Sequence, residues 1–280
     1  MVDYAPGIPI YRANTFAHGQ TMNHASPILS AQLLEISGAD AIGFAQSQFS
    51  SNLLSLADGQ WQAGAWLDPQ GRVRYLLQLA RMDAQHLVIL LRGGDAVSLA
   101  QALRPYIFRS KVQITARTEP AIGSGPALAE HAIHLDPQSG ELHWGFGDYS
   151  MTAGSEVAGD PAWLQRQVQA GWPWLPEAAQ GTHVGPALSL HRLGGLAIDK
   201  GCYPGQEIVA RLHYRGGLKR HLALLEAQQA AAPAESLQSG ETPAGQLLNP
   251  FAVARGEPVL AVLNDQIEPT GFLVRQRWAP

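Results

Sequence analysis

The sequence predicts an α+β fold, in which helices cover antiparallel strands. Strand-like segments at 73–80 and 86–92 precede a helix, and a further strand-like segment follows at 112–115. Short β segments at 245–248, 258–263 and 271–275 then indicate a small β-barrel or sandwich at the C-terminal end.

The first half of the chain supplies most of the predicted elements. Apolar spacing over 41–49 predicts an amphipathic helix with Ser37 as a possible cap. A strand at 62–67 leads into the turn Asp68-Pro69-Gln70-Gly71. Asp95 is suited to cap a helix that runs through Leu103 and ends before Pro105.

The second half is predicted with fewer regular elements. Residues 118–130 are rich in Gly, Pro and Ala, which is typical of a linker or long loop. A hairpin is expected around 136–140, and Asp160-Pro161 is a good start for a helix that runs to about residue 170. Residues 228–242 are structurally permissive.

Composition limits the function classes. The 280 residues are 46% hydrophobic and 15% charged, with a net charge of −4, which argues against a disordered chain and a general nucleic-acid binder. The single cysteine allows no disulfide within the chain. No secretory signal or apolar stretch of ~18 residues is visible, so we expect a cytoplasmic protein without a membrane span.

Charge is unevenly distributed. Residues 72–117 have a net charge of +6, 118–191 of −7 and 192–221 of +4. These segments are either the solvated faces of different units, or two basic segments that converge on an anionic ligand.

The most informative segment runs from Gly194 to Arg211. Residues 200–205 read as a tight turn and 206–214 as a helix, in which Glu207 stands four residues before Arg211 and could pair with it. Cys202 then precedes a helix start and follows Lys200 by two residues, features that favour a thiolate.

Several roles remain open for Cys202. It is either a reactive or ligand-contacting thiol, or a small buried hydrophobic residue. A Cys/His hydrolase pair with His191, His213 or His221 lacks a visible orienting partner. One cysteine and scattered histidines show no metal-site spacing, so no metal site is predicted.

Lys200-Gly201-Cys202-Tyr203-Pro204-Gly205-Gln206-Glu207 resembles the signature K-G-C-Y-x-G-Q-E of the YgfZ-type folate-binding proteins, relatives of the aminomethyltransferases. Tyr214 to Gly217 extend the similarity. Two earlier segments also resemble the family, at 38–52 and at 67–72. Together these matches cover about residues 36–220.

The resemblance implies an aminomethyltransferase-like folate-binding fold, with two α+β subdomains at roughly 1–117 and 118–217 and a C-terminal β-barrel at 218–280. It implies tetrahydrofolate as ligand and a role in iron–sulfur cluster assembly or repair in client enzymes. Effects on tRNA modification follow, because the methylthio-transferring enzyme is an iron–sulfur protein. Cys202 inherits the role of key thiol. The candidate folate-binding residues are Lys200, Tyr203, Gln206, Glu207, Arg211 and Arg215.

Two departures separate this chain from true aminomethyltransferases. Tyr75 and Leu76 stand where those enzymes carry an acidic pair, so the acid/base group for methylene transfer is missing. Ala187 stands where the pterin-contacting Glu is expected, and Ser189 replaces an Asn. Loss of that carboxylate weakens folate binding by about 1–3 kcal/mol if the pterin donors stay unpaired.

The sequence therefore favours a folate-binding accessory factor for iron–sulfur proteins. The alternatives are a folate-dependent aminomethyltransferase-like enzyme and a thiol-based redox or interaction factor. Direct tRNA binding is disfavoured by the negative net charge and the lack of a known RNA module. Cations that could attract the glutamate tail of folate are Arg72, Arg74, Arg211, Arg215, Lys219 and Arg220. The sequence does not predict the client proteins or the oligomeric state.

Overall fold

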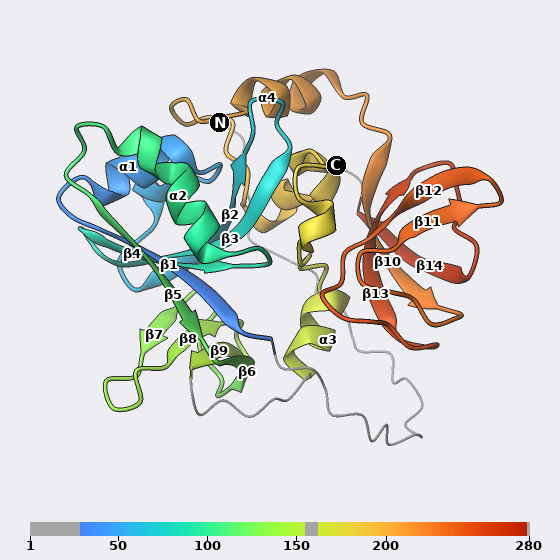
Figure 1. The fold of residues 1–280 in the computed structure, drawn as a ribbon, viewed down its shortest axis with the longest axis horizontal. Coiled ribbons are helices and arrows are strands. Elements are labelled where there is room, and N and C mark those ends of the chain that lie inside the picture. Colours follow the sequence, from blue (N-terminus) through green and yellow to red (C-terminus); the bar gives the residue numbers. More distant parts are fainter. Residues whose placement is uncertain (1–28, 155–161, 279–280) are drawn as a thin grey trace.

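The computed structural model describes residues 29–154 and 162–278, which form three antiparallel sheets (Figure 1). The first sheet lies at the left of the view, the second below it and the third at the right. The first sheet has the strand order β2 (Gln60–Leu67), β3 (Val73–Asp83), β4 (His86–Leu91), β1 (Ala31–Ser37) and β5 (Gln113–Glu119).

The first sheet is covered on both faces. Helices α1 (Ala41–Gln48) and α2 (Ala96–Ile107) pack on one face, against Leu87, Ile89 and Leu91 of β4. The alternate residues Val88 and Leu90 point to the second sheet. This two-sided burial explains why β4 is a continuous apolar run instead of an alternating pattern.

The second sheet is small and packs through aromatic side chains. Its strand order is β6 (Ala121–Gly125), β9 (Ser150–Gly154), β8 (Leu142–Gly145) and β7 (Ile133–Leu135). The core between this sheet and the first contains five tryptophans: Trp61, Trp144, Trp163, Trp172 and Trp174.

Residues 162–215 connect the second sheet to the third. They form α3 (Ala162–Gln169), the 3₁₀ turns η2 (Glu177–Ala179), η3 (Gly185–Leu188) and η4 (Leu190–Leu193), and α4 (Gln206–Arg215). Their apolar side chains join those of β2 and β3 to those of the third sheet in one core. A further 3₁₀ turn, η1 (Leu53–Ser55), follows α1.

The third sheet is five-stranded and encloses its own core. Its strand order is β11 (Ser236–Ser239), β12 (Thr242–Leu247), β13 (Pro258–Asn264), β10 (Arg220–Ala227) and β14 (Phe272–Trp278). The two edges approach each other, since the amide of Thr270, just before β14, donates to the carbonyl of Gln238 in β11 (2.8 Å).

The α+β prediction is confirmed, and several elements lie where the sequence placed them. The turn at 68–71 forms, with the Asp68 carboxylate accepting from the amides of Gln70 and Arg72. Asp95 caps α2 by accepting from the amide of Ser98 (2.7 Å). In the part of the chain that the structure describes, no helix is long and apolar enough to cross a membrane.

Two helix-end predictions were wrong. Ser37 does not cap α1, because it is the last residue of β1, and Asp40 occupies the cap position with its carboxylate turned to the amide of Lys111 (2.7 Å). Pro105 does not end α2, which continues to Ile107. Pro105 lies in the last turn, where water can satisfy the carbonyl that loses its partner.

Two predicted loops contain strands. Residues 121–125 form β6, and a Cβ added at Gly125 would lie 2.1 Å from the Thr152 hydroxyl, so this glycine serves strand packing and not a loop. The permissive segment 228–242 contains β11. The expected helix start at Asp160-Pro161 and the N-terminal segment lie outside the described residues.

Candidate functional site

Lys200 fastens the turn 200–205 to the segment that follows α1. Its ammonium group donates to the carbonyls of Gln46 (2.6 Å), Phe49 (2.5 Å) and Ser51 (2.9 Å). An ammonium has three N–H donors, so this set uses all of them. Burial lowers the pKa of Lys200 to about 8. Lys200 is therefore committed to holding the turn.

Tyr203 supports the same attachment from inside. Its ring lies 4.8 Å from the Lys200 nitrogen, and its buried hydroxyl donates to the carbonyl of Ala197 (2.9 Å). Burial raises the pKa of Tyr203 to about 12, so the hydroxyl stays protonated. The side-chain amide of Gln206 closes the turn, because its Nε2 donates to the Lys200 carbonyl (3.0 Å).

Close backbone contact joins the turn to the one at 68–71. Gly205 has φ +78°, and a Cβ added there would lie 2.6 Å from the carbonyl oxygen of Asp68. A Cβ added at Gly71 would lie 3.0 Å from the side chain of Ile208. Both glycines are needed for this approach, so two of the segments that resemble the YgfZ family pack directly against each other.

The third resembling segment completes the assembly through buried Ser50. Its hydroxyl donates to the carbonyl of Gly195 (2.6 Å) and accepts from the amide of Ala65 in β2 (2.9 Å). Gln46 shapes this segment by accepting from the amide of Leu53 (2.7 Å) and donating to Asn52 (3.0 Å). The sequence pattern gave no signal for Ser50.

Cys202 is displayed at the outer surface of this assembly. Its thiol is free and exposed, and α4 begins four residues later with Gly205 at the cap position. Glu207, Arg211 and Arg215 are exposed along α4. The predicted Glu207–Arg211 pair is absent among the ion pairs of the described residues. Exposed ion pairs four residues apart on a helix gain only about 0.3–0.5 kcal/mol, so solvation of both groups competes with pairing.

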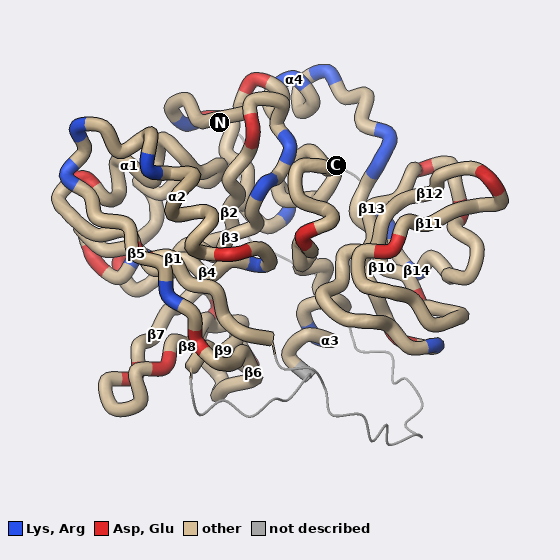
Figure 2. Tube along the Cα trace, viewed as in Figure 1, with Lys and Arg blue, Asp and Glu red and all other residues tan. Residues whose placement is uncertain are grey.

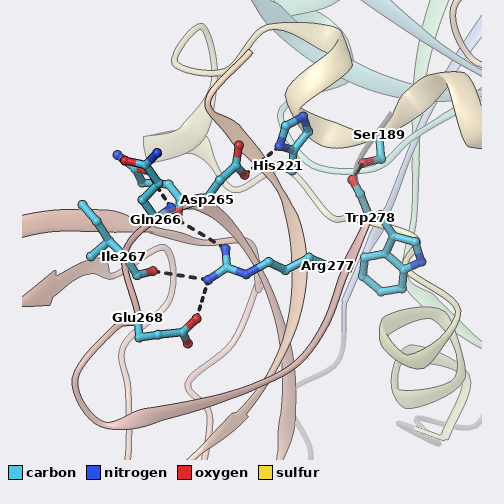
Figure 3. Close-up of polar contacts among 9 residues, drawn as sticks. Ser189, His221, Asp265, Gln266, Ile267, Glu268, Arg277 and Trp278 are labelled. Carbon is cyan, nitrogen blue, oxygen red and sulfur yellow. Dashed lines mark hydrogen bonds and ion pairs between the residues drawn. The ribbon is translucent and has the colours of Figure 1, made fainter. Parts of the chain in front are cut away.

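The described residues contain no cluster of three His, Cys, Asp or Glu side chains that could hold a metal. His221 is buried, and its Nδ1 lies 2.7 Å from the Asp265 carboxylate (Figure 3). This contact orients the ring toward a neighbouring strand connection. Within the described part of the chain no hydrogen bond joins Cys202 to a histidine, so the structure forms no Cys/His pair.

Tyr75, Leu76 and Ala187 stand where aminomethyltransferases would carry carboxylates, and all three are buried in the packed interior. Tyr75 is buried with its ring 6.0 Å from that of Trp66, and Leu76 lies in the core of the connecting segment. Burial, aided by the charge of Asp95, raises the pKa of Tyr75, which therefore cannot replace a carboxylate base. Ala187 is 2% exposed in η3.

Ser189 also has a structural role. It adopts a left-handed conformation (φ 53°), and its hydroxyl donates to the carbonyl of Trp278 at the end of β14 (2.8 Å; Figure 3). In the same view the guanidinium of Arg277 donates to the carbonyl of Ile267 and to the carboxylate of Glu268. The end of the third sheet is thus fixed on both sides.

A cleft of about 320 Å³ opens where the first sheet meets the segment before η2. It is lined by the end of β4 and the residues after it, the start of β1, part of the connecting segment with Trp174 and Glu177, and Pro250 from the connection between β12 and β13. Two carboxylates, those of Asp95 and Glu177, and no Lys or Arg are in this lining. A Cβ at Gly93 would lie 2.0 Å from the carbonyl oxygen of Leu175, so the wall of the cleft requires a glycine there.

Arg92 is a buried cation directly next to this wall. Its guanidinium donates to the carbonyls of Pro173 (2.9 Å) and Trp172 (3.2 Å) and to the side chain of Gln78 (3.3 Å), and it lies over the ring of Trp174. Burial lowers the pKa of Arg92 to about 9. Among the described residues no carboxylate forms an ion pair with it, and its donors are turned to these carbonyls and to Gln78 and not into the cleft, whose lining does not include Arg92. The sequence signal that could have singled out Arg92 is its position directly after the apolar strand β4.

Comparison with known proteins gives relatives along most of the chain. The tRNA-modifying protein YgfZ of Klebsiella pneumoniae is 27% identical over 282 aligned residues, which cover 87% of this chain and 86% of that protein. The corresponding protein of Vibrio atlanticus is 24% identical over 262 residues, with coverage of 82% and 81%. An uncharacterized protein of Haemophilus influenzae is 29% identical over 203 residues, with coverage of 70% and 71%. No family model matches the chain.

The fold is that of an aminomethyltransferase. The glycine cleavage system aminomethyltransferase T of Bartonella henselae superposes with a TM-score of 0.64 over 88% of this chain and 80% of that chain, at 13% identity. The predicted resemblance and the predicted fold are both confirmed.

Proposed function

Because this chain is a YgfZ-type relative with an aminomethyltransferase-like fold, we propose that it is a folate-binding accessory protein. Its role is to support iron–sulfur cluster assembly or repair in client enzymes, with indirect effects on tRNA modification. The name of its relatives, tRNA-modifying protein YgfZ, supports the second part. The observation that carries the proposal is the exposed thiol of Cys202 on a turn fixed by Lys200.

A single exposed thiol suits transient contact with a partner. It can form a mixed disulfide or supply one ligand to a cluster shared between two chains, but it cannot hold a cluster alone. Lys200 and Tyr203 hold the turn without covering the thiol. The turn therefore acts as a rigid mount for a reactive side chain.

The cleft next to Arg92 is our candidate for the folate site. Its volume falls at the lower end of the range for small-molecule sites, about 300–1,000 Å³. The pterin of folate carries amino and N–H donors, and the lining of the cleft offers the carboxylates of Asp95 and Glu177 as acceptors. The packed Tyr75, Leu76 and Ala187 leave no acid/base group for methylene transfer at those positions, which favours binding over catalysis.

Folate binding is tested by calorimetry of the purified chain with tetrahydrofolate. Micromolar binding is expected, with tighter binding by Ala187→Glu if the pterin donors lack a partner in the wild type. Ala187 is buried, so the thermal stability of this variant is measured first, and Ala178→Glu at an exposed position is the matched control. Absence of binding in every folded variant would refute the folate assignment.

The role of Cys202 is tested separately, in cells that lack the protein. Wild type, Cys202→Ser and Cys202→Ala are compared for restoring the methylthio modification of tRNA and the activity of the iron–sulfur enzyme that makes it. Loss of both readouts in the two variants is expected. Full restoration by Cys202→Ala would refute a function through the thiol.

The exposure of Cys202 also favours a second candidate, a thiol-based redox factor in which folate is incidental. The two functions differ in one combination of results. A chain that needs Cys202 in cells, yet binds no tetrahydrofolate, fits the redox factor and not the folate-binding accessory protein.

A further inference from the structure

A basic strip follows the exposed face of α4 and continues into the start of β10. We define this basic strip by five exposed residues: Arg211, Tyr214, Arg215, Lys219 and Arg220. Residues 208–225 contain these four Arg and Lys side chains and no Asp or Glu. Figure 2 shows the blue segments of α4 and of the start of β10 along one edge of the molecule.

The cations of the basic strip have no partner in the described part of the chain, where their side chains make no ion pair and no hydrogen bond. Some exposed arginines elsewhere do pair, for example Arg166 with Asp148 (3.5 Å) and Arg275 with Glu226 (2.5 Å). The donors of the basic strip are therefore free for an external anion.

The spacing of the basic strip suits a chain of anions. Arg211 and Arg215 are four residues apart on α4, so they lie on one face, about 6 Å apart along the helix axis. Gly216 and Gly217 follow with φ +64° and +90° and open space around them, and they turn the chain toward Lys219.

Tyr214 adds an exposed ring three residues after Arg211 on the same helix. Its side chain is 75% exposed, and its only aromatic neighbour among the described residues is His213, which meets it edge-on at 5.0 Å. An exposed ring on the same helix as unpaired arginines is a combination that binds single-stranded nucleic acid, with the cations on the phosphates and the ring under a base.

We propose that the basic strip binds a single-stranded segment of RNA. The choice of RNA rests on the proposed function in tRNA modification, and direct contact goes beyond the indirect effect stated there. The negative net charge of the whole chain counted against RNA binding. The positive charge of residues 208–225 is concentrated in the basic strip, however, where an RNA would make contact. RNA docked along α4 would lie next to the Cys202 turn.

Two other occupants fit less well. A stable protein interface needs a central apolar patch, whereas the other large exposed apolar side chains lie on different elements: Leu54, Val97, Tyr106, Phe108, Leu135 and Leu273. Folate is assigned to the cleft, whose lining includes no residue of the basic strip.

The test is fluorescence anisotropy with a labelled single-stranded RNA of about 12 nucleotides, a length within the range such sites bind. Binding is measured from 50 to 200 mM salt. The wild type is expected to bind and to weaken as salt rises. The double variant Arg211→Gln/Arg215→Gln should lower the slope of log K against log salt by about 1.4, because two contacts are lost. Tyr214→Ala should weaken binding about 5- to 100-fold at an unchanged slope.

Arg104→Gln/Arg109→Gln is the matched control, since it removes two exposed arginines on α2 and just after it, outside the basic strip, and should change affinity less than about twofold. Absence of salt-dependent binding, or equal loss in the control, would overturn the proposal. Binding of an acidic protein but not of RNA would do the same. Tetrahydrofolate calorimetry on the wild type is independent, so failure of the folate assignment is recognised separately.

Discussion

The signature segment at 200–207 has two sides with opposite environments. On the inner side, the side chains of Lys200 and Tyr203 donate hydrogen bonds to backbone carbonyls, and Gly205 contacts the turn at 68–71. On the outer side, Cys202 and Glu207 meet solvent. The eight residues from 200 to 207 thus contain both the side chains that fix the turn and the exposed thiol of Cys202.

This difference changes how a sequence signature is interpreted. The resemblance made Lys200, Tyr203 and Gln206 candidates for folate contact. Their positions instead explain why these residue types are needed for the turn itself, while the exposed Cys202 has no visible structural role. Substitutions on the inner side should therefore change stability, and substitutions on the outer side should change function alone.

The largest effect is expected for Lys200→Met. Three buried or half-buried carbonyls lose a charged donor, so the free energy of unfolding should fall by about 4 kcal/mol. Urea unfolding measures it. Lys219→Met, at an exposed lysine, is the control and should stay within about 0.5 kcal/mol of wild type. Equal stability of the two variants would break the distinction between the two sides.

Gly205→Ala should come next, with a loss of about 3 kcal/mol. The added Cβ meets the carbonyl oxygen of Asp68, and alanine also disfavours the positive φ. Gly217→Ala shares the positive φ but has open space, so it should lose only about 1 kcal/mol. Thermal and urea unfolding of the pair separate crowding from backbone strain. A matching loss in both would show that contact with the turn at 68–71 contributes nothing.

The pH dependence of the free energy of unfolding tests whether Lys200 is held in a buried position with a lowered pKa. Its pKa is about 8 in the folded protein and near 10.4 when unfolded, so the unfolded chain binds more protons between these values. Stability of the wild type should therefore rise by roughly 1 kcal/mol from pH 8 to pH 10 relative to Lys200→Met, a gain limited by partial exposure. A flat difference would mean that the three carbonyls offset the burial of the charge.

Tyr203→Phe isolates one hydrogen bond of the inner side. The carbonyl of Ala197 loses its donor while the ring stays in place, so the loss should be about 1 kcal/mol. Tyr214→Phe alters a hydroxyl on an exposed side chain and should leave the unfolding curve unchanged. A loss in the second variant and not in the first would contradict the packing described for α4.

The smallest effect is expected for Cys202→Ser. An exposed thiol makes little contribution to packing, so the free energy of unfolding should change by less than about 0.5 kcal/mol. The wild type should react rapidly with a thiol reagent such as dithionitrobenzoate, without prior unfolding. Slow reaction limited by unfolding would show that Cys202 belongs to the inner side.

Local signals predicted the elements whose physics is local. The helix predicted at 206–214, which the structure extends by one residue, the Asp95 cap and the turn at 68–71 each follow from side chains within a few residues. The exposed character of Cys202 was one of two open alternatives, because helix periodicity does not assign a residue in an irregular turn to a face.

Contacts between distant segments were not predictable from the pattern. Lys200 reads as a surface cation, and only the folded chain brings three carbonyls from 149–154 residues earlier in the sequence to its ammonium group. β6 was missed because its glycines suggest a loop, whereas their role is to make room for neighbouring side chains in a sheet. Burial of Arg92 likewise depends on Trp172 and Trp174, far along the chain.

The separation between Lys200 and its acceptors also has a consequence for synthesis. At about 5–20 residues per second, the carbonyls of Gln46, Phe49 and Ser51 emerge from the ribosome roughly 8 to 30 seconds before Lys200. The first sheet then has time to fold and to serve as a template for the later turn. A chain whose first half has misfolded offers no such template, so the thiol is presented in its fixed position only by molecules that began folding correctly.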